Sequence, residues 1–143
     1  EHHDFHGRRL LVVEDNLLNQ EIAQSLLEME GFLVETAENG QAALDAFGSH
    51  EPGYYDAVLM DIRMPRMDGL EATRTIRAME DEGTGSIPIL AMTANAFAED
   101  IAATTAAGMN AHISKPIDFK ALWAVLGQFP ALASREEEGP QTK

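Results

Sequence analysis

Four short apolar segments of the chain are each followed by residues whose side chains can take part in chemistry. These residues are Glu14 and Asp15 after LLVV, Asp61 after AVLM, Thr93 after ILAM and Lys115 after AHIS. Each one alone has an ordinary explanation as a helix cap, a turn former or a solvated charge. Together they supply three carboxylates, a hydroxyl and an ammonium group. This combination suits phosphoryl chemistry, which depends mainly on positioning and on neutralising negative charge.

The three carboxylates also predict a metal site. Acids that share a pocket repel one another unless a positive group lies between them. The chain has no cysteine, and no histidine lies near these acids in the sequence, so the expected ligands are oxygens. Mg²⁺ fits such ligands best, because it binds one or two carboxylates together with phosphate oxygens. We expect Glu14 and Asp15 to hold Mg²⁺ together with Asp61, which we also expect to be the nucleophile that forms an aspartyl phosphate.

The residues between these groups predict the elements that position them. Brief apolar runs favour strands buried on both faces of a parallel sheet, and they occur at Leu10–Val13, Phe32–Val34, Ala57–Met60, Ile87–Met92 and Ala111–Ile113. Helical patterns follow these runs, within residues 18–29, 43–47, 70–79, 101–107 and 119–126. Five strand–helix pairs predict an α/β fold, in which ligands bind beyond the carboxyl ends of the strands. The chemical groups therefore converge at one edge of the predicted sheet.

Apolar spacing and capping residues define the helices more closely. The period of the first helix is set by Leu18, Ile22, Leu26 and Met29, which recur at intervals of four and three residues. The predicted N-caps of later helices are Asn39, Asp68 and Asp118. Asp15 and Asn16 are both candidates to cap the first. The fourth helix offers little beyond alanines and Ile101 for burial, so we expect it to be loosely held.

Length and charge narrow the class of protein. A chain of 143 residues predicts one domain, which we place at residues 8–129, with tails at residues 1–7 and 130–143. The net charge of -14 makes binding to nucleic acid or to an anionic membrane surface unfavourable. Without cysteine, disulfide scaffolds, thiolate metal sites and thiol catalysis are excluded. No apolar run approaches the length of a membrane span. We expect a cytoplasmic domain without direct membrane contact, and a membrane-bound parent protein is compatible with this expectation.

Four sequence segments carry a resemblance to a known family. LLVVEDN, VLMDIRMPRMDG, PILAMTANA and HISKPID resemble, in order and spacing, the receiver domains of two-component response regulators. The resemblance runs from about residue 9 to residue 129, and the segments MTANAF and GMNAHISKPID look most like receivers of hybrid sensor histidine kinases. It implies a flavodoxin-like (βα)5 fold with strand order 2-1-3-4-5. It also implies a signalling switch that catalyses only its own phosphorylation and dephosphorylation.

The resemblance assigns roles to individual positions. Asp61 matches the phosphoacceptor, and Glu14 and Asp15 match the acidic pair that holds Mg²⁺. Arg63 matches the residue whose backbone carbonyl binds the metal. Thr93 matches the switch hydroxyl, and Lys115 matches the lysine that contacts the phosphoryl group. The bond between Lys115 and Pro116 matches a position that is usually cis. We also hypothesise that the Arg63 side chain, together with Asn95, hinders water from attacking the phosphate.

One position departs from the family pattern. The aromatic switch residue three positions before the lysine is usually Tyr or Phe, whereas this chain has His112. One interpretation is that the imidazole is simply a ring of adequate size that turns as Tyr or Phe would. The alternative is that protonation of the imidazole near neutral pH biases the switch. In either case the resemblance implies that Thr93 and His112 relay phosphorylation to the fourth helix, fifth strand and fifth helix.

Partners and alternative functions follow from the same residues. The implied partner is a histidine kinase or a histidine phosphotransfer domain, and a phosphorylation-dependent dimer is also compatible with the family. A Mg²⁺-dependent phosphatase with an aspartyl phosphate is less favoured, because Arg63 stands where such enzymes commonly have a second Asp. A vestigial binding module is disfavoured because no expected site residue is missing. An FMN carrier is disfavoured because the loop of residues 14–16 is acidic and would repel phosphate.

Overall fold

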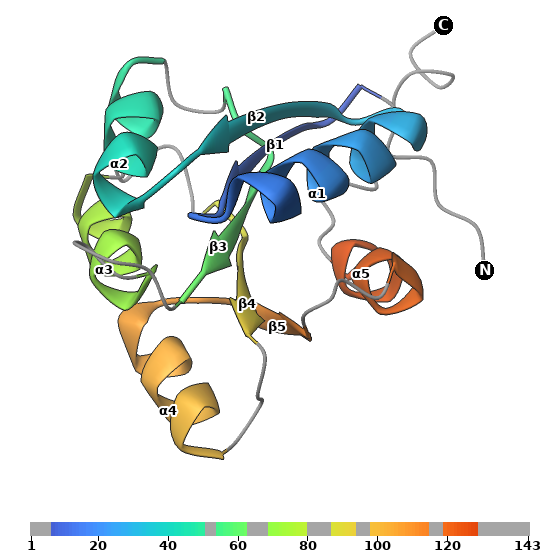
Figure 1. Ribbon diagram of the computed structural model, residues 1–143. Helices are drawn as coiled ribbons and strands as arrows, with labels where there is room; N and C mark the ends of the chain where they lie inside the picture. The colour runs from blue at the N-terminus through green and yellow to red at the C-terminus, as the bar shows by residue number, and fades with distance from the viewer. Residues whose placement is uncertain are drawn as a thin grey trace, which may run out of the picture.

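The protein is a three-layer α/β structure, described here from a computed structural model (Figure 1). The structure describes residues 7–50, 54–62, 69–79, 87–93, 98–114 and 119–128. Five parallel strands form one sheet, and they are β1 (Arg9–Val13), β2 (Leu33–Ala37), β3 (Ala57–Asp61), β4 (Ile89–Thr93) and β5 (Ala111–Ser114). Their order is β2-β1-β3-β4-β5, which makes β3 the central strand and confirms the predicted topology. The proposed tails and their boundaries remain predictions.

Five helices alternate with the strands along the chain. They are α1 (Leu17–Met29), α2 (Gly40–Gly48), α3 (Gly69–Met79), α4 (Ala98–Ala107) and α5 (Phe119–Leu126). α1 and α5 cover one face of the sheet, while α2, α3 and α4 lie on the other side (Figure 1). The part of the chain that the structure describes contains no helix long and apolar enough to cross a membrane.

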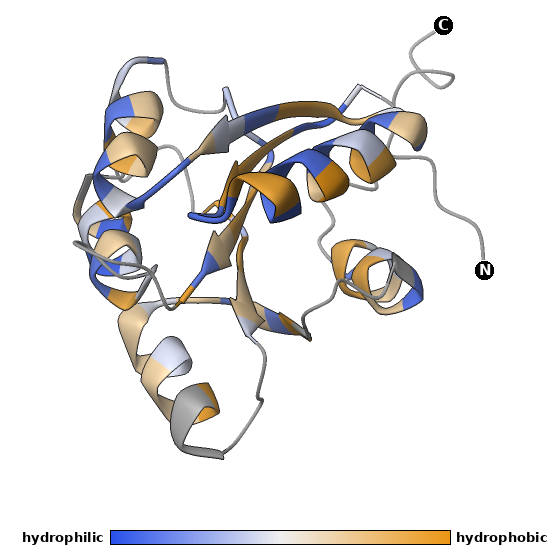
Figure 2. Ribbon diagram, in the orientation of Figure 1, coloured by the Kyte–Doolittle hydropathy of each residue, from blue (hydrophilic) through white to orange (hydrophobic). Residues whose placement is uncertain are grey.

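Alternating strand residues feed two apolar clusters, one on each face of the sheet. One cluster joins β1, β3 and β4 to α1 and α5 through Leu10, Leu59 and Leu90. The other joins the same strands to α2 and α3 through Leu11, Val58 and Ile89. Both sets of strand side chains are fully buried, which is why these strands are continuous apolar runs in the sequence (Figure 2).

Two strands differ at their ends from the sequence prediction. β2 continues to Ala37, three residues beyond the predicted end, because it pairs with β1 along its whole length. Its polar residues Glu35 and Thr36 are tolerated because β2 is an edge strand. β4 starts at Ile89 and includes Thr93, so it is displaced toward the carboxyl side of the predicted run. The predicted order of elements is unaffected by these shifts.

Asparagine side chains start the first two helices. The Asn19 amide donates to the side-chain oxygen of Asn16 at 2.9 Å, and the Ala42 amide donates to that of Asn39 at 2.8 Å. Asn39 is therefore the cap that the sequence predicts, and Asn16 rather than Asp15 caps α1. Asp15 is left available for another role. The predicted caps Asp68 and Asp118 lie outside the described residues.

The apolar stripe of α1 predicts the helix correctly but does not face the core. Its members are between 39% and 78% exposed, and they are Leu18, Ile22, Leu26 and Met29. The buried residues of α1 are instead Ala23 and Leu27. A corresponding correction applies to α4, where Ile101 is 41% exposed while Thr104 and Ala107 are buried. Both helices therefore carry apolar side chains on their outer surfaces.

Candidate functional site

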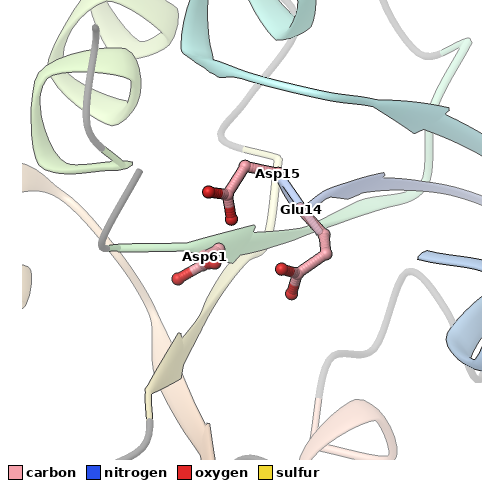
Figure 3. Close-up of side chains that lie close together, drawn as sticks. All are labelled: Glu14, Asp15 and Asp61. Atoms are coloured by element: carbon pink, nitrogen blue, oxygen red, sulfur yellow. The ribbon is translucent and has the colours of Figure 1, made fainter. Parts of the chain in front are cut away.

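Three carboxylates meet at the carboxyl ends of β1 and β3. Asp61 is the last residue of β3, and Glu14 and Asp15 directly follow β1, whose last residue Val13 is paired with Met60. One ligand oxygen from each acid lies within 4.8 Å of the other two (Figure 3). Glu14 and Asp61 are each only 3% exposed, whereas Asp15 is exposed. The acids predicted to act together therefore form one cluster, called the carboxylate site below.

Backbone and side-chain hydrogen bonds fix the position of Glu14. Its amide donates to the carbonyl oxygen of Ala37 at 3.0 Å, which extends the pairing of β1 with β2 by one residue. The Gln20 side chain donates to the Glu14 carbonyl at 2.7 Å, and the Asn16 amide donates to the Glu14 carboxylate at 3.1 Å. The first turn of α1 thus holds both the backbone and the carboxylate of Glu14. The supporting role of Gln20 is not predicted by the sequence.

A glycine allows α3 to begin directly beside Asp61. A Cβ placed on Gly69 would lie 2.4 Å from the Asp61 carbonyl oxygen and 2.8 Å from the Ile62 Cα. Both contacts are with backbone, which cannot turn aside as a flexible side chain does. Gly69 therefore has a structural role at the site that its sequence position alone does not define. Its signal was present, because Gly69 ends the segment VLMDIRMPRMDG.

Thr93 lies at the same edge of the sheet, on the strand next to Asp61. It is the last residue of β4 and is 3% exposed, and Asp61 is paired with its neighbour Met92. Four of the predicted site residues are thereby placed together: Glu14, Asp15, Asp61 and Thr93. Arg63, Asn95 and Lys115 lie outside the described residues, as does the Lys115–Pro116 bond. Their roles remain predictions.

His112 lies on β5, away from the carboxylates. Its backbone is paired with Ala91, two residues before Thr93 on β4. Its side chain is partly buried, and the ring Nε2 is in hydrogen-bond contact with the Thr104 hydroxyl of α4. The predicted switch residue therefore contacts α4. This partner on α4 is not predicted by the sequence.

The electrostatics of the carboxylate site favour a bound cation. Two unit charges 4.8 Å apart repel by on the order of 3 kcal/mol at an effective dielectric constant of about 20. The ligand atoms are all carboxylate oxygens, and they come from one exposed and two buried residues. Such a set suits a hard divalent ion that keeps some of its water. The donor atoms of the site therefore fit Mg²⁺.

Comparison with known sequences identifies the domain. The profile of the family described as "Response regulator receiver domain" matches residues 10–126. The sensor histidine kinase GacS of Pseudomonas protegens is 41% identical over 134 residues, which cover 93% of this chain and 14% of that protein. The hybrid signal transduction histidine kinase I of Dictyostelium discoideum is 40% identical over 121 residues, covering 83% of this chain. The chain spans 7 to 15% of the length of the curated relatives it matches.

Solved structures agree with this assignment. The receiver domain of a sensor histidine kinase from Pseudomonas aeruginosa, solved with magnesium in its active-site cleft, is 38% identical, with a TM-score of 0.73. The match covers 85% of this chain and 96% of that one. A second match, with a TM-score of 0.77 and 26% identity, is to a co-crystal of a Saccharomyces cerevisiae histidine phosphotransfer protein with the receiver domain of its response regulator. It covers 92% of both chains. The chain therefore belongs to the response regulator receiver domain family of two-component signalling.

Proposed function

We propose that Asp61 is the phosphoacceptor of this receiver domain and takes its phosphoryl group from a phosphohistidine. The observation that carries the proposal is the position of Asp61 at the end of the central strand, buried and within 4.8 Å of Glu14 and Asp15. Burial at the end of a fully packed strand holds its carboxylate in a fixed direction. Fixed positioning is the main requirement of phosphoryl transfer.

The transfer exchanges one bond to phosphorus for another. A carboxylate oxygen of Asp61 attacks phosphorus, and the O–P bond forms as the P–N bond of the phosphohistidine breaks. The histidine ring keeps the electron pair and takes a proton from water. Attack of water on the same phosphorus later returns the Asp61 carboxylate and releases phosphate. No other substrate is turned over.

Glu14 and Asp15 would bind Mg²⁺ beside Asp61, with Arg63 contributing its backbone carbonyl. The bound ion would supply positive charge to the phosphoryl oxygens. Glu14 suits this role because its carboxylate already accepts a hydrogen bond from the Asn16 amide, at 3.1 Å, which fixes its direction. The Thr93 hydroxyl and the Lys115 ammonium would donate to phosphoryl oxygens. Thr93 and His112 would then relay the change to α4, β5 and α5.

The exposed stripe of α1 suits the partner that donates the phosphoryl group. It begins at Leu18, which is 65% exposed and lies in the first turn of α1, three residues after Asp15. A partner that brings a phosphohistidine to Asp61 must lie over this edge of the domain. Exposed Leu18, Ile22 and Leu26 would then be buried against an apolar surface of a histidine kinase or histidine phosphotransfer domain.

The phosphoacceptor role is tested by offering acetyl phosphate with Mg²⁺ and measuring the intact mass of the chain. Asp61→Asn is compared with Asp45→Asn, which removes an exposed acid from α2. We expect one phosphoryl group on the wild-type chain and on Asp45→Asn, and none on Asp61→Asn. Equal labelling of all three chains would disprove the proposal. Absence of labelling from all three would favour a vestigial domain.

The partner surface is tested by comparing two phosphoryl donors. Ile22→Ser makes the stripe polar without touching the carboxylate site. We expect this change to slow transfer from a phosphorylated histidine phosphotransfer protein by about tenfold, because one apolar anchor contributes roughly 1 to 2 kcal/mol. Labelling by acetyl phosphate, which needs no docking surface, should keep its wild-type rate. Slowing of both reactions equally would contradict docking on α1.

A further inference from the structure

The side chains of His112 and Thr104 connect β5 to α4. The Nε2 atom of His112 is in hydrogen-bond contact with the Thr104 hydroxyl. Thr104 is fully buried within α4, although its neighbours Thr105 and Ala106 on the same helix are exposed. The most extensive contact of α4 is with α3 rather than with the sheet. Among the side chains that the structure describes, the bond between Thr104 and His112 therefore contributes to positioning α4 against β5.

The Thr104 hydroxyl has a second hydrogen-bond partner within α4. The Thr104 hydroxyl donates its one proton to the Ile101 carbonyl oxygen at 3.0 Å. When the hydroxyl donates to Ile101, its lone pairs accept from His112 in the tautomer that carries a hydrogen on Nε2. A phenylalanine at position 112 could fill similar space but could not make this bond. The contact thus depends on the histidine that distinguishes this chain from the commoner family pattern.

The strand register connects this contact to the carboxylate site. His112 is paired with Ala91, and Thr93, two residues further along β4, is paired with Ser114. Because side chains alternate along strands, those of Thr93 and His112 lie on the same face of the sheet. Buried Ala91 belongs to the apolar cluster that this face shares with α3. The residue of β4 that is paired with His112 therefore has only a small side chain.

We propose that the hydrogen bond between His112 and Thr104 is a latch that holds α4 in its unphosphorylated position and must break when Asp61 is phosphorylated. This inference rests on the proposed function of Asp61. A turn of the His112 ring away from α4 breaks the bond, since hydrogen bonds weaken steeply outside a narrow range of distance and angle. The latch therefore opposes activation, and a chain without it is activated more easily.

The latch is tested first in the free chain, by amide hydrogen exchange of α4. Thr104→Val removes the hydroxyl but keeps the branched shape, Thr104→Ser keeps the hydroxyl, and Thr105→Val makes the same change at an exposed neighbour. We expect faster exchange across α4 in Thr104→Val only, by about fivefold, the effect of losing one ordinary hydrogen bond. Thr104→Val with wild-type exchange would overturn the latch, whether or not Asp61 is the phosphoacceptor.

Coupling to the site is tested by titrating beryllofluoride, a phosphoryl mimic, at fixed Mg²⁺ and following amide NMR signals. We expect Thr104→Val to reach half-saturation at about fivefold lower beryllofluoride than the wild type, and Thr104→Ser and Thr105→Val to match the wild type. In a His112→Phe background, Thr104→Val should have no further effect. The same shift in that background would overturn the proposal. A wild-type chain that ignores beryllofluoride would refute the proposed function, and the exchange experiment would still decide whether the bond holds α4.

Discussion

At the carboxyl ends of the strands three acids lie within 4.8 Å of one another, whereas on the amino side of the sheet Glu35 and Asp56 each lie beside an arginine. Glu35 of β2 accepts hydrogen bonds from the hydroxyls of Tyr54 at 2.8 Å and Tyr55 at 2.7 Å. The guanidinium of Arg9 lies 4.0 Å from Glu35 and 4.2 Å above the Tyr54 ring. These contacts join Arg9, Glu35, Tyr54 and Tyr55 into one network.

Another arginine secures the amino ends of β4 and β5. Arg77 of α3 donates to the Gly108 carbonyl from two nitrogens, at 2.7 and 3.0 Å, and to the Ile87 carbonyl at 2.8 Å. It also donates to the side-chain oxygen of Asn110 at 2.8 Å. Asn110 in turn accepts from the Ile89 amide at 2.8 Å, at the first residue of β4. A Cβ on Gly108, whose φ is +111°, would lie 3.0 Å from the Arg77 side chain.

The contacts near the amino ends stabilise the fold, whereas the acids at the carboxyl ends suit the proposed function. Matched partners near the amino ends hold loops and strand ends together, and they need nothing from solution. The like charges at the carboxyl ends repel one another, and a bound cation would reduce this repulsion. Substitutions at the two ends should therefore change the free energy of unfolding in opposite directions.

The largest expected loss follows Arg77→Ala. Removing the guanidinium leaves the Gly108 and Ile87 carbonyls and the Asn110 side chain short of a donor, so we expect a loss of about 3 kcal/mol in the free energy of unfolding. Urea unfolding measures it. The control is Arg74→Ala, on an exposed turn of the same helix, for which we expect a change within about 0.5 kcal/mol. Equal effects of the two substitutions would contradict the role given to Arg77.

A loss of about 2 kcal/mol is expected for Gly69→Ala, because the new Cβ overlaps the Asp61 backbone. This is the one change at the carboxyl ends that should destabilise the fold, since it acts through packing rather than charge. Labelling by acetyl phosphate should fall as well, because the Asp61 carboxylate is displaced. The matched control is Gly48→Ala at the exposed end of α2, which should not lower the free energy of unfolding and should leave labelling unchanged. A stable Gly69→Ala chain would refute the close approach.

Removing one negative charge from each region gives the sharpest contrast. In EDTA, Glu35→Gln should lower the free energy of unfolding by about 1 kcal/mol, because two tyrosine hydroxyls lose a charged acceptor. Asp15→Asn should raise it by about 0.5 kcal/mol, because repulsion within the carboxylate site falls. Adding Mg²⁺ should then stabilise the wild-type chain and Glu35→Gln, but not Asp15→Asn. If both substitutions lowered the free energy of unfolding in EDTA, the contrast between the two regions would be wrong.

The smallest expected effects are changes in pH dependence. Burial raises the pKa of Glu35, but hydrogen bonds from Tyr55 and Tyr54 and the charges of His50 and Arg9 outweigh it and hold this pKa below 4.5. A lowered pKa means that the contribution of Glu35 to stability is present above about pH 4.5 and is lost as the pH falls through the folded value. Glu35→Gln should flatten the acid side of the stability curve, whereas exposed Glu38→Gln should not. Parallel curves for Glu35→Gln and the wild type would contradict this account.

Tyr55 should act on the alkaline side of the same curve. Burial, together with the hydrogen bond to Glu35, raises the pKa of Tyr55 well above 10. Its contribution to stability is therefore present below about pH 10 and is lost as the pH rises through the folded value. Tyr55→Phe should remove this alkaline loss, which unfolding at pH values on both sides of 10 would measure.

The sequence predicts the carboxyl ends well because topology alone brings them together. The correct order of the strands is enough to place Asp61 and Thr93 at the same edge. Glu14 and Asp15 join them because they directly follow β1. The exposed stripe of α1 could not be predicted, because apolar periodicity identifies a helix but not the face that it buries. Gly69 lies in a recognisable motif, but the sequence does not show why a glycine is needed there. The reason is that a Cβ on Gly69 would lie 2.4 Å from the Asp61 carbonyl oxygen.

The partners of individual side chains are harder to predict than the strand ends. Arg77 and Gly108 are 31 residues apart, and Glu35 and Tyr55 are 20 residues apart. Neither pair has a spacing that a helix or strand would impose. The bond between His112 and Thr104 depends on the rotation of α4 against β5, which the alanine-rich sequence of α4 leaves open. Such contacts follow from packing and need the three-dimensional structure.

The central claim is that Asp61 carries the phosphoryl group, and chemical trapping tests it most directly. After labelling with acetyl phosphate and Mg²⁺, borohydride reduces an aspartyl phosphate to homoserine, and peptide mass spectrometry locates the altered residue. We predict homoserine at position 61 alone, and none when EDTA replaces Mg²⁺. Homoserine at Asp15 or Asp56, or trapping that is unaffected by EDTA, would contradict the account.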